Sequence, residues 1–132
     1  MNAEMNYLAM YGLFLAILIF LQVFISAQQH GLLSLLGNRE NIVSTGMAER
    51  AERAVQNSII AMALIAPAVL MIAYNDLSSS STILATQIFL TARITYSVFF
   101  IFGIIYLRTF SWITGFLATA YLYLMLFEHS QI

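Results

Sequence analysis

The sequence predicts an all-α integral membrane protein: an up-down bundle of four transmembrane helices that takes up nearly the whole chain. Of the 132 residues, 61% are hydrophobic and 8% are charged, whereas soluble domains carry about 25% charged residues. Four apolar segments also approach the roughly 20 residues that a helix needs to cross the hydrocarbon core. Because hydrocarbon satisfies no backbone polar group, we expect these segments to be helices of a single domain over residues 1–132.

We expect the spans at residues 5–27, 54–74, 83–107 and 110–127. The residues before the first span include Glu4 but no Lys or Arg, so the positive region of a secretory signal is missing and the first helix should be retained. Gln22 should bond a neighbouring helix. Pro67 should kink the second helix or break its hydrogen-bond ladder. Arg93 falls inside the third span.

The connections set the topology and the orientation. The first, residues 28–53, is long and polar; the second, residues 75–82, is short and rich in serine; the third, around Arg108 and Thr109, is barely a turn. Short connections force neighbouring helices to run antiparallel. The connections on one side carry Arg39, Arg50, Arg53 and Arg108, and the opposite side has no Lys or Arg. The positive-inside rule then places the arginines in the cytoplasm and both termini outside.

Composition excludes several classes of function. The net charge is −1 and the chain has no lysine, which argues against a nucleic-acid binder, because phosphates need a basic face. The chain has no cysteine, and His30 and His129 lie far apart in the sequence. We therefore expect no disulfide, no thiolate nucleophile and no bound metal.

Arg93 is the residue that most needs an explanation, because a charge inside a span costs at least a few kcal/mol, about 2.5 or more. It must face the bundle or a subunit interface and find a partner there. It could serve an anion or substrate site, or it could clamp two helices together. Its partner could be Asn57, Gln87, a backbone carbonyl or a bound anion.

The start of the second helix carries a second polar group. Arg50, Arg53 and Asn57 are spaced so that they share one helix face, and Glu49 and Arg53 form a favourable i, i+4 pair. A charged helix end in the headgroup region is the simpler interpretation. On the third helix, Tyr96 follows Arg93 on roughly one face. Its hydroxyl could bond a thiol or carboxylate, or its ring could simply pack.

Two stretches of the sequence form motifs that are more specific than the overall composition. One comprises residues 37–40 (GNRE) and 46–57 (GMAERAERAVQN), and the other comprises residues 92–96 (ARITY) and 103–112. Together they resemble the MAPEG family, the membrane-associated proteins of eicosanoid and glutathione metabolism, and especially its bacterial members. The layout of four spans with a long first connection resembles that family as well.

The resemblance implies a homotrimer in the bacterial inner membrane, and in that membrane the positive-inside rule puts both termini on the periplasmic side. Glutathione would bind as co-substrate between neighbouring subunits, towards the cytoplasm. Its thiolate would attack lipophilic electrophiles or reduce lipid hydroperoxides. The family pattern maps onto Arg53 and Asn57 of the second helix, onto Arg93 and Tyr96 of the third, and near Arg108. Arg53 and Arg93 would hold carboxylates, Asn57 would orient the peptide amides, and Tyr96 and Arg108 would lie nearest the sulfur.

The resemblance implies that the site binds the carboxylates of glutathione and stabilises its thiolate, and positive charge favours both. Arginine offers paired donors to a carboxylate. A thiol has a pKa of about 8.5, which nearby positive charge lowers. The resemblance leaves open the lipophilic substrate, and it leaves open the choice between conjugation and peroxidase chemistry.

The sequence departs from the family pattern at several polar positions. Ile60 stands where the pattern has a Glu, Phe100 where it has a second Tyr, and Gln28 or Gln29 where it often has an Arg; Pro67 is displaced by about a helical turn. These losses favour an alternative: a non-catalytic scaffold, an accessory subunit of a larger membrane complex, or a lipid-binding protein on the same fold. A transporter is disfavoured, because the chain shows no inverted repeat.

Overall fold

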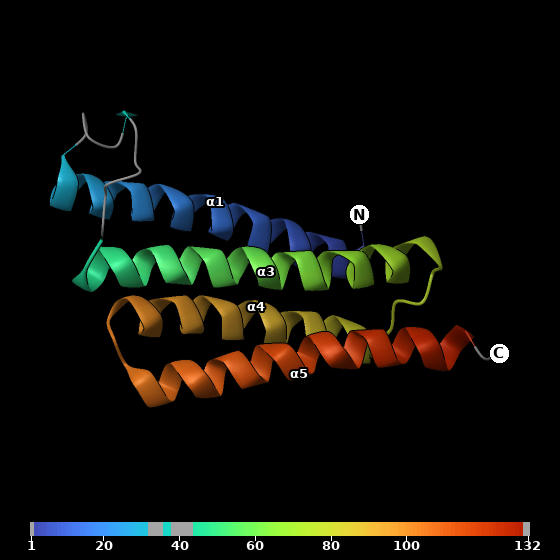
Figure 1. Cartoon of the computed structure of the whole chain (residues 1–132). Helices are drawn as coiled ribbons and strands as arrows, with labels where there is room; N and C mark the ends of the chain where they lie inside the picture. The colour runs from blue at the N-terminus through green and yellow to red at the C-terminus, as the bar shows by residue number, and fades with distance from the viewer. Residues whose placement is uncertain (1, 32–35, 38–43, 131–132) are drawn as a thin grey trace.

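The computed structural model describes residues 2–31, 36–37 and 44–130, and over these residues the chain is helical and has no strand. The helices are α1 (Ala3–His30), α3 (Gly46–Tyr74), α4 (Ser80–Ile101) and α5 (Ile105–Ser130). They lie side by side and alternate in direction (Figure 1), and all four are long and apolar enough to cross a membrane. The predicted four-helix membrane fold is confirmed. Asn38, Arg39 and Glu40 of the first connection lie outside the described residues.

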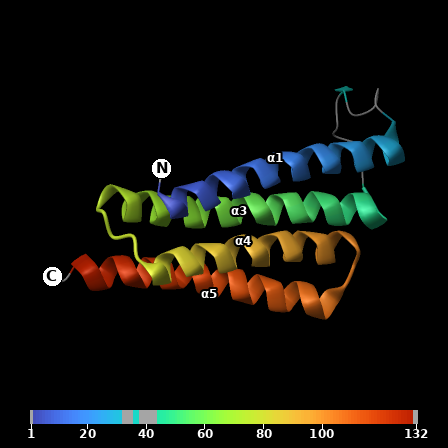
Figure 2. The same cartoon turned by 180° about the vertical axis from the view of Figure 1, so that it is seen from behind.

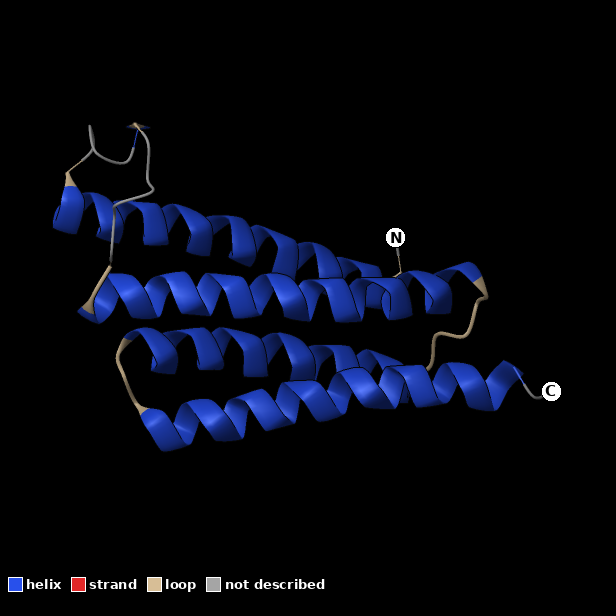
Figure 3. Ribbon diagram, in the orientation of Figure 1, coloured by secondary structure: helices blue, strands red, loops and turns tan. Residues whose placement is uncertain are grey.

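The helices form two hairpins that meet through α3 and α4. In the described part of the chain, α1 contacts α3 and α4, and α5 contacts the same two helices, whereas α1 and α5 do not touch. The view from behind shows the same order, with α4 in front of α5 (Figure 2). Both ends of the chain lie at one end of the bundle, and the turn between α4 and α5 lies at the other (Figure 3).

Local sequence explains where the helices start and end. The Asn2 side chain accepts a hydrogen bond from the Met5 backbone N–H, 2.9 Å away, and caps α1. Ser79 and Thr82 form a capping box at the start of α4. Both devices satisfy N–H groups that have no partner within the helix. Gly31, at a φ of 86°, follows the last residue of α1.

The turn between α4 and α5 comes earlier than the expected connection at Arg108 and Thr109. α4 ends at Ile101, and Phe102, Gly103 and Ile104 form the turn before α5. Gly103 has a φ of 77°, in the left-handed region that glycine enters readily. The two residues that flank Gly103, Phe102 and Ile104, are hydrophobic. A hydropathy profile therefore does not distinguish this turn from the membrane-spanning helices on either side. Arg108 consequently lies in the first turn of α5.

The second helix begins at Gly46, eight residues before the expected span, so the charged segment before residue 54 is helical as well. The helix continues through Pro67 to Tyr74. Gln22 corrects an expectation, because its amide donates to the Ser26 hydroxyl, 3.0 Å away on the same helix, and not to a neighbouring helix. A hydroxyl one turn along satisfies the amide locally.

The interior is packed with apolar side chains and tied by a few polar contacts. Tyr11 is fully buried, packs edge-on against Phe89 with 5.0 Å between the ring centroids, and donates to the Ser58 carbonyl oxygen at 2.8 Å. This contact joins α1 to α3. Large apolar side chains such as Phe20, which is 74% exposed, cover the outside, as lipid favours.

Near the N-terminus, Glu4 is fully buried without a basic partner among the described residues. Its carboxylate accepts hydrogen bonds from the Ser78 hydroxyl at 2.7 and 2.9 Å and from the Thr82 hydroxyl at 2.7 Å. The start of α1 is thereby joined to the α3–α4 connection and to α4. Buried carboxylates need such donors, because burial removes their hydration.

Candidate functional site

Arg93 lies deep in the bundle, with a side chain that is 2% exposed. Eight residues, or about 12 Å of helix, separate it from the end of α4. Its Nη2 donates to the Asn57 side-chain oxygen at 2.9 Å and lies 3.4 Å from the Ser58 hydroxyl oxygen. Asn57 is therefore its partner among the expected alternatives, while Gln87 donates instead to the Tyr7 hydroxyl at 2.6 Å. The contact links α4 to α3.

A row of two aromatic rings between two guanidinium groups runs from Arg93 towards the start of α5. The Arg93 guanidinium carbon lies 4.3 Å from the centroid of the Tyr96 ring. The Tyr96 and Phe100 centroids are 5.6 Å apart, and the Arg108 guanidinium carbon lies 4.5 Å from the Phe100 centroid. Such cation–π contacts stabilise a charge held away from water. Phe100, a departure from the family pattern, thus joins Tyr96 to Arg108.

Arg53 stands apart from this row. It bonds Glu49 at 2.7 Å, as the i, i+4 spacing predicted, and its side chain is 65% exposed. Arg50 turns inward instead and donates from Nε to the Ile101 carbonyl oxygen at 2.9 Å. Of the expected site residues, the structure brings together Asn57, Arg93, Tyr96 and Arg108 and leaves Arg53 on the surface of the single chain.

Two serines near Arg93 were not singled out from the sequence. Ser58 and Ser97 are buried, with hydroxyl oxygens 3.4 Å apart, and the Ser58 hydroxyl also approaches Arg93. The available signal was the spacing of Arg93 and Ser97, one helical turn apart, which puts both on one face. Small polar residues are typical of helix interfaces in membranes.

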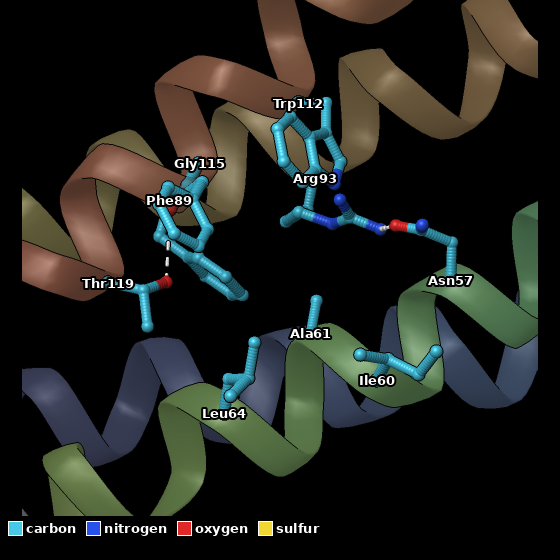
Figure 4. A pocket seen from close by; sticks show the side chains of 10 residues that line it. Asn57, Ile60, Ala61, Leu64, Phe89, Arg93, Trp112, Gly115 and Thr119 are labelled. Atoms are coloured by element: carbon cyan, nitrogen blue, oxygen red, sulfur yellow. Dashed lines mark hydrogen bonds between the residues drawn. The ribbon is translucent and has the colours of Figure 1, made fainter.

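A cavity of about 150 Å³ lies beside Arg93, between α3, α4 and α5 (Figure 4). Asn57, Arg93 and Thr119 are its polar side chains, and Trp112 adds an indole N–H donor. Thr119 is already engaged, since its hydroxyl donates to the Gly115 carbonyl oxygen at 3.0 Å. The apolar wall comprises Ile60, Ala61, Leu64, Phe89, Trp112 and Phe116. The cavity thus has one polar corner and is otherwise apolar.

The Arg93 Nε–H is buried and has no hydrogen-bond partner in the described part of the chain. No described carboxylate pairs with this guanidinium either. Ile60, at the position where the resemblance leads one to expect a glutamate, contributes an apolar side chain to the cavity wall. Arg93 is therefore a buried cation held by neutral groups, an arrangement that favours the approach of an anion or another acceptor.

No group of three or more His, Asp or Glu side chains within the described residues is arranged to hold a metal ion. The polar atoms gathered around Arg93 are an arginine, an amide and hydroxyls. These groups bind anionic or hydrogen-bonding ligands.

The model of the MAPEG family matches residues 6–127, which covers all four helices nearly from end to end. No curated protein matches the chain.

Proposed function

The chain belongs to the MAPEG family, and from this premise we propose that it is a glutathione-dependent transferase or peroxidase. Its second substrates would be lipophilic electrophiles or lipid hydroperoxides, which reach the protein through the bilayer. Membership places it among the membrane proteins of glutathione and eicosanoid metabolism. Glutathione as co-substrate, the chemistry and the site residues are parts of the proposal.

The row from Asn57 through Arg93, Tyr96 and Phe100 to Arg108 is the observation that carries the proposal. In this row, Arg93, Arg108 and the phenol of Tyr96 lie along the C-terminal half of α4. This half of α4 leads to the end of the bundle where Arg50, Arg53 and Arg108 lie. A thiolate beside Arg108 and the Tyr96 hydroxyl would be stabilised by charge and by a hydrogen bond.

The remaining residues would hold the peptide. Arg53 is paired with Glu49 but its side chain is 65% exposed, so it would exchange this partner for a carboxylate of glutathione. Asn57 would orient the peptide amides, with its own side-chain oxygen fixed by Arg93. Because Arg93 is 2% exposed, we assign it the task of holding Asn57 and supplying positive charge to a carboxylate that enters the site.

We further propose that the protein is a homotrimer of the bacterial inner membrane. The exposure of Arg53, away from the row around Arg93, supports a site completed by a neighbouring copy. Arg50, Arg53 and Arg108 lie towards one end of the bundle. The positive-inside rule makes that end cytoplasmic and both termini periplasmic.

A second candidate is a non-catalytic subunit of a larger membrane complex, or a lipid-binding protein, on the same fold. It is favoured by the apolar Ile60 in the cavity wall and by the lack of a carboxylate beside Arg93 in the described residues. Each lost charge-assisted contact would cost glutathione affinity about one to two decades.

Calorimetric titration of reduced glutathione into the detergent-purified protein separates the two candidates. A glutathione enzyme should bind in the micromolar to millimolar range, and Arg53→Ala should abolish binding. Gln56→Ala, which alters an exposed side chain on the same helix, should leave binding unchanged. Folded, oligomeric protein that releases no binding heat would contradict the proposal and direct the search to partner subunits and co-purifying lipids.

A further inference from the structure

We propose that Arg50 is a positioning residue for Arg108: it fixes the turn between α4 and α5 and thereby holds the Arg108 guanidinium over Phe100, beside the thiolate. The thiolate rests on the proposed function. The placement of Arg108 by Arg50 does not, and it can be measured without glutathione.

The end of α4 shows what Arg50 contributes. A helix leaves its last four carbonyl groups without an intrahelical partner. The turn that follows α4 satisfies three of them from its own backbone N–H groups: Phe102 donates to Val98 at 3.1 Å, Gly103 to Phe100 at 3.1 Å, and Ile104 to Phe99 at 2.9 Å. The fourth carbonyl, that of Ile101, accepts from the Arg50 Nε at 2.9 Å. Arg50 on α3 thus completes the cap of α4.

The Arg50 side chain also packs against the turn. A Cβ added at Gly103 would lie 3.6 Å from the Arg50 Nε and 3.7 Å from its guanidinium carbon, so the guanidinium lies directly beside this glycine. Arg50 is half-buried, and among the described residues no acid pairs with it. The carbonyl end of α4 is the partner that its charge finds, as the helix dipole favours.

The position of the turn determines where Arg108 lies. The Arg108 backbone N–H donates to the Ile104 carbonyl oxygen at 3.3 Å, so its backbone is bonded directly to the turn. Its side chain reaches back to α4, where the guanidinium carbon lies 4.5 Å from the Phe100 centroid. A turn that moves carries Arg108 with it and leaves Phe100 behind on α4. A misplacement of about 1 Å can cost a reaction about 10²-fold.

Two substitutions of Arg50 separate its hydrogen bond from its charge. Glutamine carries its side-chain nitrogen at the same distance along the side chain as the arginine Nε. Arg50→Gln therefore removes the charge and keeps a donor for the Ile101 carbonyl. Arg50→Met has a similar length but neither charge nor donor. A role in positioning requires that only the methionine variant displaces Arg108.

The Arg108 side chain can be observed by NMR, because the chain has only five arginines. Full-length protein labelled with ¹⁵N-arginine, in detergent and without glutathione, gives one Nε–H signal for each. Arg108→Lys identifies the Arg108 signal by its loss. Phe100→Leu shows where this signal lies without the ring current of Phe100.

We expect Arg50→Met to move the Arg108 signal at least halfway to its position in Phe100→Leu protein, and Arg50→Gln to leave it in place. Glu4→Ala is the control for destabilisation, because it removes buried hydrogen bonds at the opposite end of the bundle; it should not move the signal. A signal that stays in place in folded Arg50→Met protein, or that moves equally in Arg50→Gln, overturns the proposal.

Turnover of glutathione with a lipophilic electrophile provides the second readout. Arg50→Met should lower it by up to about 10²–10³-fold, the loss expected for Arg108→Ala. It should also shift the rise of turnover to higher pH, since a thiol with less positive charge nearby ionises less readily. In the Arg108→Ala background Arg50→Met should have no further effect on turnover. A pH profile that stays unchanged in Arg50→Met, or a further loss in the double variant, contradicts positioning through Arg108.

The two readouts fail separately. Wild-type protein that neither binds nor turns over glutathione refutes the proposed function, while the NMR signal still decides whether Arg50 places Arg108. Glutathione turnover in a protein whose Arg108 signal does not respond to Arg50→Met refutes the positioning role and leaves the proposed function intact.

Discussion

The Nε of Arg50 donates a hydrogen bond to the backbone carbonyl oxygen of Ile101, 2.9 Å away. Ile101 is the last residue of α4, so this carbonyl is one of those that a helix end leaves without an intrahelical partner. A cation at a helix C-terminus is favourable as well. The contact joins the start of α3 to the turn between α4 and α5.

Replacement of Arg50 by Met should lower stability by about 1.5–3 kcal/mol, the usual contribution of a hydrogen bond that involves a charged group. Arg53→Met is the matched control, because that exposed i, i+4 pair contributes about 0.3–0.5 kcal/mol. Equilibrium unfolding in detergent measures both variants. Equal losses for the two variants would contradict the importance of the Ile101 contact.

Gly103→Ala should destabilise the protein by about 1–2 kcal/mol, because a Cβ is disfavoured at a positive φ. The added Cβ would lie 3.6 Å from the Arg50 Nε, an ordinary contact, so the backbone conformation alone accounts for the loss. Gly12→Ala serves as control: it lies within α1 and its Cβ would meet Met62 at 3.7 Å. That variant should be neutral or more stable by about 0.5–1 kcal/mol, and unfolding curves distinguish the two.

The Glu4 contacts predict a measurable coupling with Thr82. Glu4→Ala leaves the buried Thr82 hydroxyl and the exposed Ser78 hydroxyl without their carboxylate acceptor and should cost about 1–3 kcal/mol. Thr82→Val removes one of the donors. In a double-mutant cycle the pair should show a coupling of about 0.5–3 kcal/mol. Glu128→Ala changes an exposed acid near the same end and should have little effect; additivity between Glu4 and Thr82 would argue against the contact.

Ile60→Glu should be tolerated better than Ile59→Glu. Both side chains are exposed on α3, at 60% and 47%, but only residue 60 lines the cavity that Arg93 also lines. An acid at the centre of a membrane helix costs about 2.5–3.5 kcal/mol, and a guanidinium within reach offsets this cost. Yield of folded protein and thermal stability provide the comparison. Equal loss in both variants would show that residue 60 cannot reach Arg93.

Within the proposed enzyme, Arg108→Ala should lower glutathione-dependent turnover by about 10²–10³-fold, the usual effect of removing a group that stabilises developing charge. Tyr96→Phe should lower it by at least about tenfold. Tyr106→Phe is the control, since Tyr106 is 89% exposed. Turnover of a lipophilic electrophile and of a lipid hydroperoxide provides the assay. Activity that survives both site variants unchanged would remove these two residues from the mechanism.

The number and type of the helices could be predicted because hydrophobicity alone determines which segments enter lipid. The bounds could not be predicted to the same degree. Phe102 and Ile104 flank Gly103 in the turn after α4, and their hydrophobicity resembles that of a span. The nearest polar pair, Arg108 and Thr109, led us to expect the connection there, but both residues lie at the start of α5.

Within the candidate site, the sequence predicted contacts between residues of one helix but not contacts between residues of different helices. The Glu49–Arg53 pair follows from i, i+4 geometry alone. The contact between Arg93 and Asn57 depends on how α3 and α4 face each other, which the sequence left among several alternatives. Gln22 shows the opposite case, since a bond expected across helices is satisfied by Ser26 on the same helix.

The arrangement in two hairpins bears on how the chain enters the membrane. α1 and α3 form one hairpin and α4 and α5 the other, and within the described residues α1 and α5 have no contact. Each hairpin can therefore be inserted as a unit during synthesis, before the two dock through α3 and α4. In the proposed orientation, with the arginine-bearing end in the cytoplasm, the segments that would be translocated carry Glu4, Asp76 and Glu128 and neither Lys nor Arg. No arginine outside the spans then has to cross the hydrocarbon.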